Sequence, residues 1–169
     1  VAIYHLSCKP VCRSAGRSAT AAAAYRAAQR ILDERTGLIH DYSRKRGVMS
    51  VDLVLPEGAP NWATDRQELW NAAEKAERRK DACVAREFEG ALPIELSAAQ
   101  RRQLALDFAK KMAGTEGCAV DVAIHEPSRH GDQRNYHAHM LRTTRQVTHH
   151  GLGAKLDTEK AGRRRKADL

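Results

Sequence analysis

Apolar and polar residues alternate most clearly in two runs in the second half of the chain. In residues 118–125, valine and isoleucine at every second position alternate with Ala, Asp and His, the period-two pattern of a strand with two different faces. In residues 135–142, His137 and His139 share one face in the same way. The intervening residues 126–135 are rich in Pro, Ser, Gly and Asp, which turn the chain. The pattern therefore predicts two antiparallel strands joined by a loop.

The rest of the chain alternates between helical and strand periodicity. Strands are predicted at residues 2–8, 38–42, 48–55 and 84–92, and helices at residues 18–35, 64–79 and 97–114. The two strands around residues 43–47 are expected to form a hairpin through that basic turn. The order β-α-β-β-α-β-α-β-β predicts an α+β domain with a largely antiparallel sheet and helices on one side.

Capping signals mark the starts of the predicted helices. Ser18 is a candidate N-cap, and Gly37 is placed to end the first helix. The second and third helices begin with the capping-box pairs Thr64 with Gln67 and Ser97 with Gln100. The residues expected to face the core are Trp70 and Ala73 in the second helix and Leu104, Phe108 and Met112 in the third.

A chain of 169 residues is expected to form one domain with a sizeable core. We predict that this domain spans residues 1–142. Residues 143–169 then form a basic polar tail, disordered when alone, which would start a linker if further domains follow. No apolar run approaches the roughly 20 residues that span a bilayer, and no signal peptide is seen, so no membrane association and a cytoplasmic location are expected. The four cysteines lack a zinc-ribbon spacing and are expected to be buried or half-buried free thiols.

Positive charge is concentrated at the two ends of the chain. Residues 1–46 hold nine Lys or Arg against three Asp or Glu, a net +6, and residues 118–169 hold ten against six, a net +4. The middle of the chain holds ten against twelve, a net −2. This distribution favours a polyanionic partner, above all nucleic acid. The expected phosphate contacts are Arg13, Arg17, Arg26, Arg30, Arg44, Lys45 and Arg46, with Tyr42 and Trp62 as candidates for base stacking.

The predicted strand pair would bring His125 beside His137 and His139. Three imidazoles on one sheet face make a metal site with open positions for water or substrate. An H-x-H pair by itself is more often a pair of solvent-facing side chains, and it is the position of His125 that favours a metal.

Other residues are candidates for catalysis. Tyr25 lies among alanines with Arg26 and Arg30 beside it, which would leave its phenol accessible, although a core tyrosine packed over alanines fits the same pattern. A phenol is almost fully protonated at neutral pH, so a nucleophilic tyrosine requires activation. Glu87 and Glu89 share one strand face and would orient a histidine or accept a proton, unless they form a solvated acidic edge. Asp121 competes for the role of orienting a histidine.

Several of these motifs, in order along residues 2–142, resemble the MobA/MobL family of plasmid relaxases. They are Ala-Ile-Tyr-His-Leu-Ser at 2–7, Arg13-Ser14, Ser18-Ala19, Tyr25, the glutamate strand at 86–95, and His125-x11-His137-x-His139, which is similar to the histidine triad of HUH endonucleases.

The resemblance implies an HUH domain with a five-stranded sheet, a conjugative relaxase that nicks single-stranded origin-of-transfer DNA. Tyr25 would attack the scissile phosphate and leave a 5′-phosphotyrosine and a free 3′-OH. The three histidines would hold one divalent ion, Mn²⁺ or Mg²⁺. Relaxosome accessory proteins and a coupling protein would be further partners.

Two alternatives remain at the sequence level. An HUH replication initiator or transposase would share the chemistry, but in those relatives the tyrosine follows the histidine pair, whereas Tyr25 precedes it. A non-catalytic single-strand-binding module would explain the basic ends but needs neither the histidines nor the tyrosine.

Overall fold

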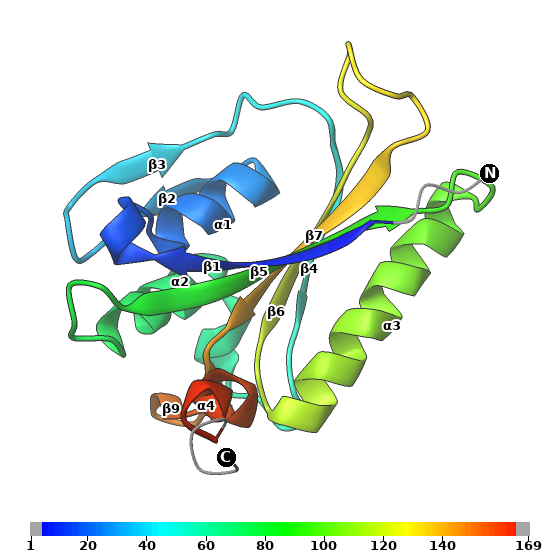
Figure 1. Ribbon diagram of the computed structural model, residues 1–169. Coiled ribbons are helices and arrows are strands. Elements are labelled where there is room, and N and C mark those ends of the chain that lie inside the picture. The colour runs from blue at the N-terminus through cyan, green and yellow to red at the C-terminus, as the bar shows by residue number, and fades with distance from the viewer. Residues whose placement is uncertain (1–4, 165–169) are drawn as a thin grey trace.

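A computed structural model describes residues 5–164, with side chains described as far as Lys160 (Figure 1). Its centre is a five-stranded sheet in the order β1-β5-β7-β6-β4, in which all neighbouring strands are antiparallel. The predicted antiparallel five-stranded α+β fold is thereby confirmed. The strands of this sheet are β1 (Leu6–Cys12), β4 (Val48–Val54), β5 (Cys83–Leu92), β6 (Val120–His125) and β7 (Tyr136–Thr143). The start of the predicted strand 2–8, with Tyr4, lies outside the described residues.

Helices cover both faces of this sheet, so the prediction of helices on one side is wrong. On one face, α1 (Ala19–Ala27) and α2 (Arg66–Lys75) share an apolar cluster with Leu141 of β7. On the other face, α3 (Ala98–Glu116) shares a cluster with Val122 and Met140 (Figure 1). Residues 140 and 141 point to opposite faces because side chains alternate along a strand. The buried strands β6 and β7 therefore contribute apolar side chains to both faces, and the histidines occupy one end of them.

The predicted helix 18–35 is too long. Ser18 caps α1 as expected, but the helix ends at Ala27 because Ala28 adopts a left-handed conformation, with φ of 52°. The chain then forms a two-stranded sheet of β2 (Arg30–Leu32) and β3 (Ile39–Asp41). Asp33 stabilises the turn between these strands by accepting the N–H groups of Arg35 and Thr36. Strand 38–42 thus pairs with β2, and β4 pairs with β6, so the hairpin predicted across residues 43–47 is also wrong.

The caps of the later helices differ in how well they were predicted. The capping box of Ser97 with Gln100 is present, whereas α2 is capped by Asp65, because Thr64 ends a short 3₁₀ helix (Asn61–Thr64). Trp70 and Ala73 are buried as expected. The face expected for α3 is wrong: Leu104 and Phe108 remain 46% and 40% exposed, Met112 is only partly buried, and the helix packs through Leu106 and the alanines Ala105, Ala109 and Ala113. Small side chains let this helix approach the sheet closely, which the i, i+4 spacing of large residues did not reveal.

The described part of the predicted tail is folded, contrary to expectation. It forms a hairpin of β8 (Arg145–Thr148) and β9 (Gly151–Lys155), followed by α4 (Asp157–Arg164). Glu159 of α4 forms ion pairs with Arg86 and with the buried Arg142, which fixes this unit to the main sheet. A 3₁₀ turn (Arg13–Ala15) completes the fold. No helix among the described residues is long and apolar enough to cross a bilayer. The cysteines are free thiols as expected, but Cys8 is exposed rather than buried or half-buried.

Candidate metal and nucleophile site

Three histidines meet at the end of the β6–β7 pair. His125 stands directly opposite His137, and His139 is opposite Ala123 two positions further along the ladder. All three side chains therefore project from one face, with ring nitrogens within 4.8 Å of one another. This is the arrangement expected from the alternation of residues in the two strands.

Hydrogen bonds hold each imidazole ring and leave one nitrogen of each free to bind a ligand. His139 Nδ1 donates to Glu87 Oε1 at 2.8 Å, His137 Nδ1 to the carbonyl of Asn135 at 3.0 Å, and His125 Nε2 to the carbonyl of Arg26 at 2.9 Å. Because these acceptors are carbonyl or carboxylate oxygens, the facing nitrogen carries the proton and the other nitrogen keeps its lone pair. Metal-binding histidines are held by this kind of N–H contact. The donor set fits one divalent ion.

Burial favours the neutral form of His125 and of His139. It lowers the pKa of His125 to about 4, against the opposing effect of the hydrogen bond to the Arg26 carbonyl. Burial also lowers the pKa of His139, although the hydrogen bond with Glu87 opposes that shift. A neutral imidazole is the form that binds a metal ion.

Glu87 connects the histidines to α1. It accepts from His139 and forms an ion pair with Arg26, whose Nε lies 2.7 Å from Oε1. Burial would raise the pKa of Glu87, but these two hydrogen bonds outweigh it and lower the pKa to about 2. Glu89 is more exposed, and its Oε2 lies 4.0 Å from His139 Nδ1. The two glutamates share the histidine face, as their spacing predicts, and only Glu87 contacts a ring closely.

Tyr25 lies in the same cleft as the histidines. This histidine cleft, about 510 Å³ in volume, is lined by residues that include Tyr25, Glu89, Arg129 and all three histidines. The Tyr25 side chain is 42% exposed, so it is not a core residue. Lys45 Nζ lies 3.5 Å from the centroid of its ring and donates to its main-chain carbonyl, and Tyr42 packs edge-on against the same ring. The ring is thus held from two sides by the loop that leads into β4.

The predicted phosphate contacts fall into two groups. Arg17, Arg30, Arg44 and Arg46 are exposed, as phosphate contacts would be. Arg26 and Lys45 instead interact with Glu87 and with Tyr25, inside the site itself.

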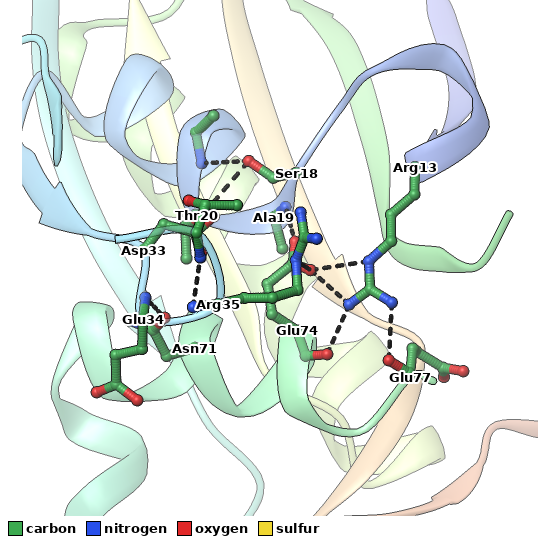
Figure 2. A network of polar contacts seen from close by, with 12 residues as sticks. Arg13, Ser18, Ala19, Thr20, Asp33, Glu34, Arg35, Asn71, Glu74 and Glu77 are labelled. Carbon is green, nitrogen blue, oxygen red and sulfur yellow. Dashed lines mark hydrogen bonds and ion pairs between the residues drawn. The ribbon is translucent and has the colours of Figure 1, made fainter. Parts of the chain in front are cut away.

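Arg13 must be removed from the set of phosphate contacts. Its guanidinium binds the carboxylate and the carbonyl of Glu74 and the carbonyls of Glu77 and Arg79, as Figure 2 shows in part. Its side chain is only 9% exposed. Arg13 therefore joins the start of α1 to the end of α2, and Glu74 also accepts the N–H of Ala19.

Two further expectations are corrected. Asp121 accepts from Arg66 and from the indole of Trp70, so it orients no histidine. Trp62 donates its indole N–H to the carbonyl of Thr148 and packs against the core, which leaves Tyr42 as the better candidate for stacking. The sequence reasoning missed Arg129, which lines the histidine cleft. Its place in the loop between the two histidine strands was the available signal.

The chain is similar in sequence to mobilization and conjugal transfer proteins. A model of the MobA/MobL family matches residues 17–168. The mobilization protein MobL of Acidithiobacillus ferridurans is 47% identical over 177 residues, which cover 92% of this chain and 46% of that protein. A probable mobilization protein MobA of Bifidobacterium longum is 40% identical over 87% of this chain and 26% of its own length, and the conjugal transfer protein TraA of Rhizobium radiobacter is 36% identical over 92% and 14%. The chain thus spans less than half the length of these relatives.

The fold also has a solved counterpart. A chain from work on the molecular basis of vancomycin resistance transfer in Staphylococcus aureus superposes with a TM-score of 0.79 and is 34% identical. The match covers 92% of this chain and 76% of that one. The α+β arrangement described above is therefore found in an independently solved structure.

Proposed function

This chain belongs to the MobA/MobL family, and from that premise we propose that it is a DNA relaxase of the conjugative type. Its proposed reaction is strand-specific nicking of plasmid origin-of-transfer DNA by tyrosine transesterification, followed by rejoining after transfer. The observation that carries the proposal is the shared cleft, in which an exposed tyrosine faces the same space as three histidines with a free nitrogen each.

In the proposed reaction, the hydroxyl oxygen of Tyr25 attacks the scissile phosphorus. A bond forms between that oxygen and phosphorus while the bond from phosphorus to the 3′ oxygen breaks, which gives a 5′-phosphotyrosine and a free 3′-OH. The phenolic proton is released during attack, and the leaving 3′ oxygen takes up a proton. Glu89, which lines the cleft and is partly exposed, is the candidate acceptor for the phenolic proton. The covalent intermediate is itself a phosphodiester, so a 3′-OH can attack its phosphorus, displace the tyrosine oxygen and rejoin the strand.

His125, His137 and His139 would hold one divalent ion, Mn²⁺ or Mg²⁺. When bound, such an ion polarises a phosphate oxygen and offsets the charge that develops on it, an effect worth several kcal/mol. Imidazole nitrogen suits Mn²⁺ better than Mg²⁺, so we expect tighter binding of Mn²⁺.

The remaining residues position these groups. Glu87 fixes the ring of His139, the carbonyl of Arg26 fixes the ring of His125, and Lys45 packs over the ring of Tyr25. Arg26 is next to Tyr25 in the chain, so the helix that carries the nucleophile also holds a metal ligand. Positioning of this kind lowers the entropic cost of an in-line attack.

The proposed role implies further partners and a location. Single-stranded origin DNA would be the substrate. Relaxosome accessory proteins and a coupling protein would act with this protein in DNA transfer, and the reaction would take place in the cytoplasm. Residues 1–142 with the folded hairpin and α4 would form the nicking domain.

The test uses a labelled single-stranded oligonucleotide that carries the origin sequence, with Mn²⁺. The wild-type protein should form a protease-sensitive covalent adduct, and Tyr25→Phe should form none while it still binds the oligonucleotide. Tyr42→Phe is the matched control, because its ring contacts Tyr25, and it should retain the adduct. A non-catalytic binding module would bind the oligonucleotide and give no adduct with any variant.

A further inference from the structure

Two more hollows follow the histidine cleft in series along α1. The first, named here the α1 hollow, has a volume of about 350 Å³ and shares Tyr25, Arg26 and Glu89 with the histidine cleft. The second, named here the arginine hollow, has a volume of about 530 Å³ and shares Gly16, Arg17, Ser18 and Ala21 with the α1 hollow. The three spaces therefore form one continuous depression that passes Tyr25 and reaches the start of α1.

The floor of this depression is made of small side chains. Ser18, Ala21, Ala22 and Tyr25 follow one another at helical spacing and line the α1 hollow. Alanines at the middle positions keep the surface low between Tyr25 and the start of the helix. The seven residue steps from Ser18 to Tyr25 correspond to about 10 Å of helix, a distance that a few nucleotides of single-stranded DNA can bridge.

The far end of the depression carries unpaired positive charge. The arginine hollow is lined by Arg17, Arg78 and Lys80, whose side chains form no hydrogen bond or ion pair with any described residue. Other cations there are already paired. Arg13 and Arg35 form ion pairs with Glu74 (Figure 2), and Arg79 forms one with Asp81. His40 also lines this hollow; its buried Nε2 has no hydrogen-bond partner among the residues that the structure describes, and Oδ2 of Asp33 lies 3.8 Å from it.

We propose that the arginine hollow binds backbone phosphates of the single strand on one side of the scissile phosphate, with the strand running along α1 from Tyr25. This inference rests on the proposed relaxase function and adds a second site, in which Arg17, Arg78 and Lys80 are the phosphate ligands. Unpaired guanidinium and ammonium groups at the end of a hollow suit a polyanion, because phosphate contacts release condensed counterions. The small side chains along α1 leave room for the single-stranded DNA to pass from Tyr25 to the arginine hollow.

The test compares binding of origin oligonucleotides shortened one nucleotide at a time from either side of the scissile phosphate. On one side, wild-type affinity should drop when the shortening removes the phosphates that reach the arginine hollow. The double variant Arg78→Ala with Lys80→Ala should bind the extended oligonucleotide as weakly as the shortened one. Its slope of log affinity against log salt should be less steep by about 1.4 for the extended oligonucleotide, at roughly 0.7 per lost contact, and unchanged for the short one.

The matched control removes two exposed charges from the opposite face of the sheet, with Lys110→Ala and Lys111→Ala on α3. This control should behave as the wild type does. A second variant, Ala21→Leu, fills the floor of the depression without a change of charge. It should also bind the extended oligonucleotide no more tightly than the shortened one. Ala99→Leu, at an exposed position of α3, is its control.

The inference is overturned if Arg78→Ala with Lys80→Ala retains the wild-type preference for the extended oligonucleotide. That failure differs from failure of the proposed function, in which the wild-type protein forms no covalent adduct even though binding depends on length. The double variant should still form the adduct with the short oligonucleotide, because neither residue lines the histidine cleft.

Discussion

At the scale of single residues, Arg26 is the point where the parts of the site meet. Its carbonyl holds His125, its guanidinium holds Glu87, and it follows Tyr25 in the chain. The histidines were predictable from the sequence because their spacing on two adjacent strands decides which way they face. The role of Arg26 was not predictable, since its partners His125 and Glu87 are distant in sequence and only the fold brings them together. The same is true of Arg13, whose partner Glu74 is far along the chain.

We expect Glu87→Gln to weaken metal binding by roughly 10- to 100-fold, because the carboxylate that orients His139 is lost. Titration of the protein with Mn²⁺ and calorimetry measures this directly. Glu89→Gln is the matched control and should keep the wild-type affinity, since Glu89 lies further from the ring. Equal losses in the two variants would mean that Glu87 has no special role toward His139.

Lys45 contributes to the position of the Tyr25 ring through a cation–π contact. Such a contact is worth about 0.5–1 kcal/mol at a partly exposed site, so Lys45→Met should slow single-turnover adduct formation by roughly 2- to 5-fold. Oligonucleotide affinity should fall no more than it does in Arg44→Met, which removes an exposed neighbouring charge. An adduct rate that matches that of Arg44→Met would assign Lys45 to phosphate binding alone.

At the scale of elements, the sequence predicted the buried strands well and the ends of α1 and α2 poorly. Strands β6 and β7 alternate strictly, so both their pairing and their faces followed from the sequence. The run of alanines after Ser18 gave no stop signal, because nothing in its composition shows that Ala28 adopts a left-handed conformation. The hairpin of β2 and β3 depends instead on the Asp33 turn and on burial of Ile31 under α1.

The left-handed conformation of Ala28 predicts that Ala28→Gly stabilises the fold. Glycine adopts a φ of 52° without the steric cost that a Cβ atom brings, so the free energy of unfolding in urea should rise by about 1 kcal/mol. Ala27→Gly, inside the buried end of α1, should lower it instead. If Ala28→Gly is destabilising as well, the local conformation of residue 28 must differ from the one described.

At the scale of the whole molecule, a cluster of ion pairs joins the C-terminal hairpin and α4 to the sheet. Glu159 binds Arg86 and Arg142, and Glu116 of α3 also binds Arg142. The composition of the tail predicted a solvated basic segment. Its ion pairs could not be predicted, because the partners of Glu159 lie on the distant strands β5 and β7. Helix α3 and the C-terminal unit thus meet at Arg142, at the end of β7 away from the histidines.

This cluster predicts a loss of stability in acid. Burial raises the pKa of Glu159, but hydrogen bonds and charges of Arg86 and Arg142 outweigh it, so the pKa lies below its ordinary value. A carboxylate with a lowered folded pKa stabilises the protein above its unfolded pKa of about 4.3, and that stabilisation disappears as pH falls through the folded value. Thermal unfolding followed from pH 7 to pH 3 should therefore show a smaller decrease for Glu159→Gln than for the wild type. Parallel pH curves for the two proteins would mean that Glu159 does not cause the loss of stability in acid.

The mass of the modified peptide shows directly whether Tyr25 is the nucleophile. After reaction with the origin oligonucleotide, the protein is treated with nuclease and digested with trypsin. A nucleotide should then be attached through its 5′-phosphate to the peptide of residues 18–26, in which Tyr25 is the single tyrosine. The same peptide from Tyr25→Phe should be unmodified. A nucleotide attached to any other peptide of the wild-type protein would show that Tyr25 is not the nucleophile.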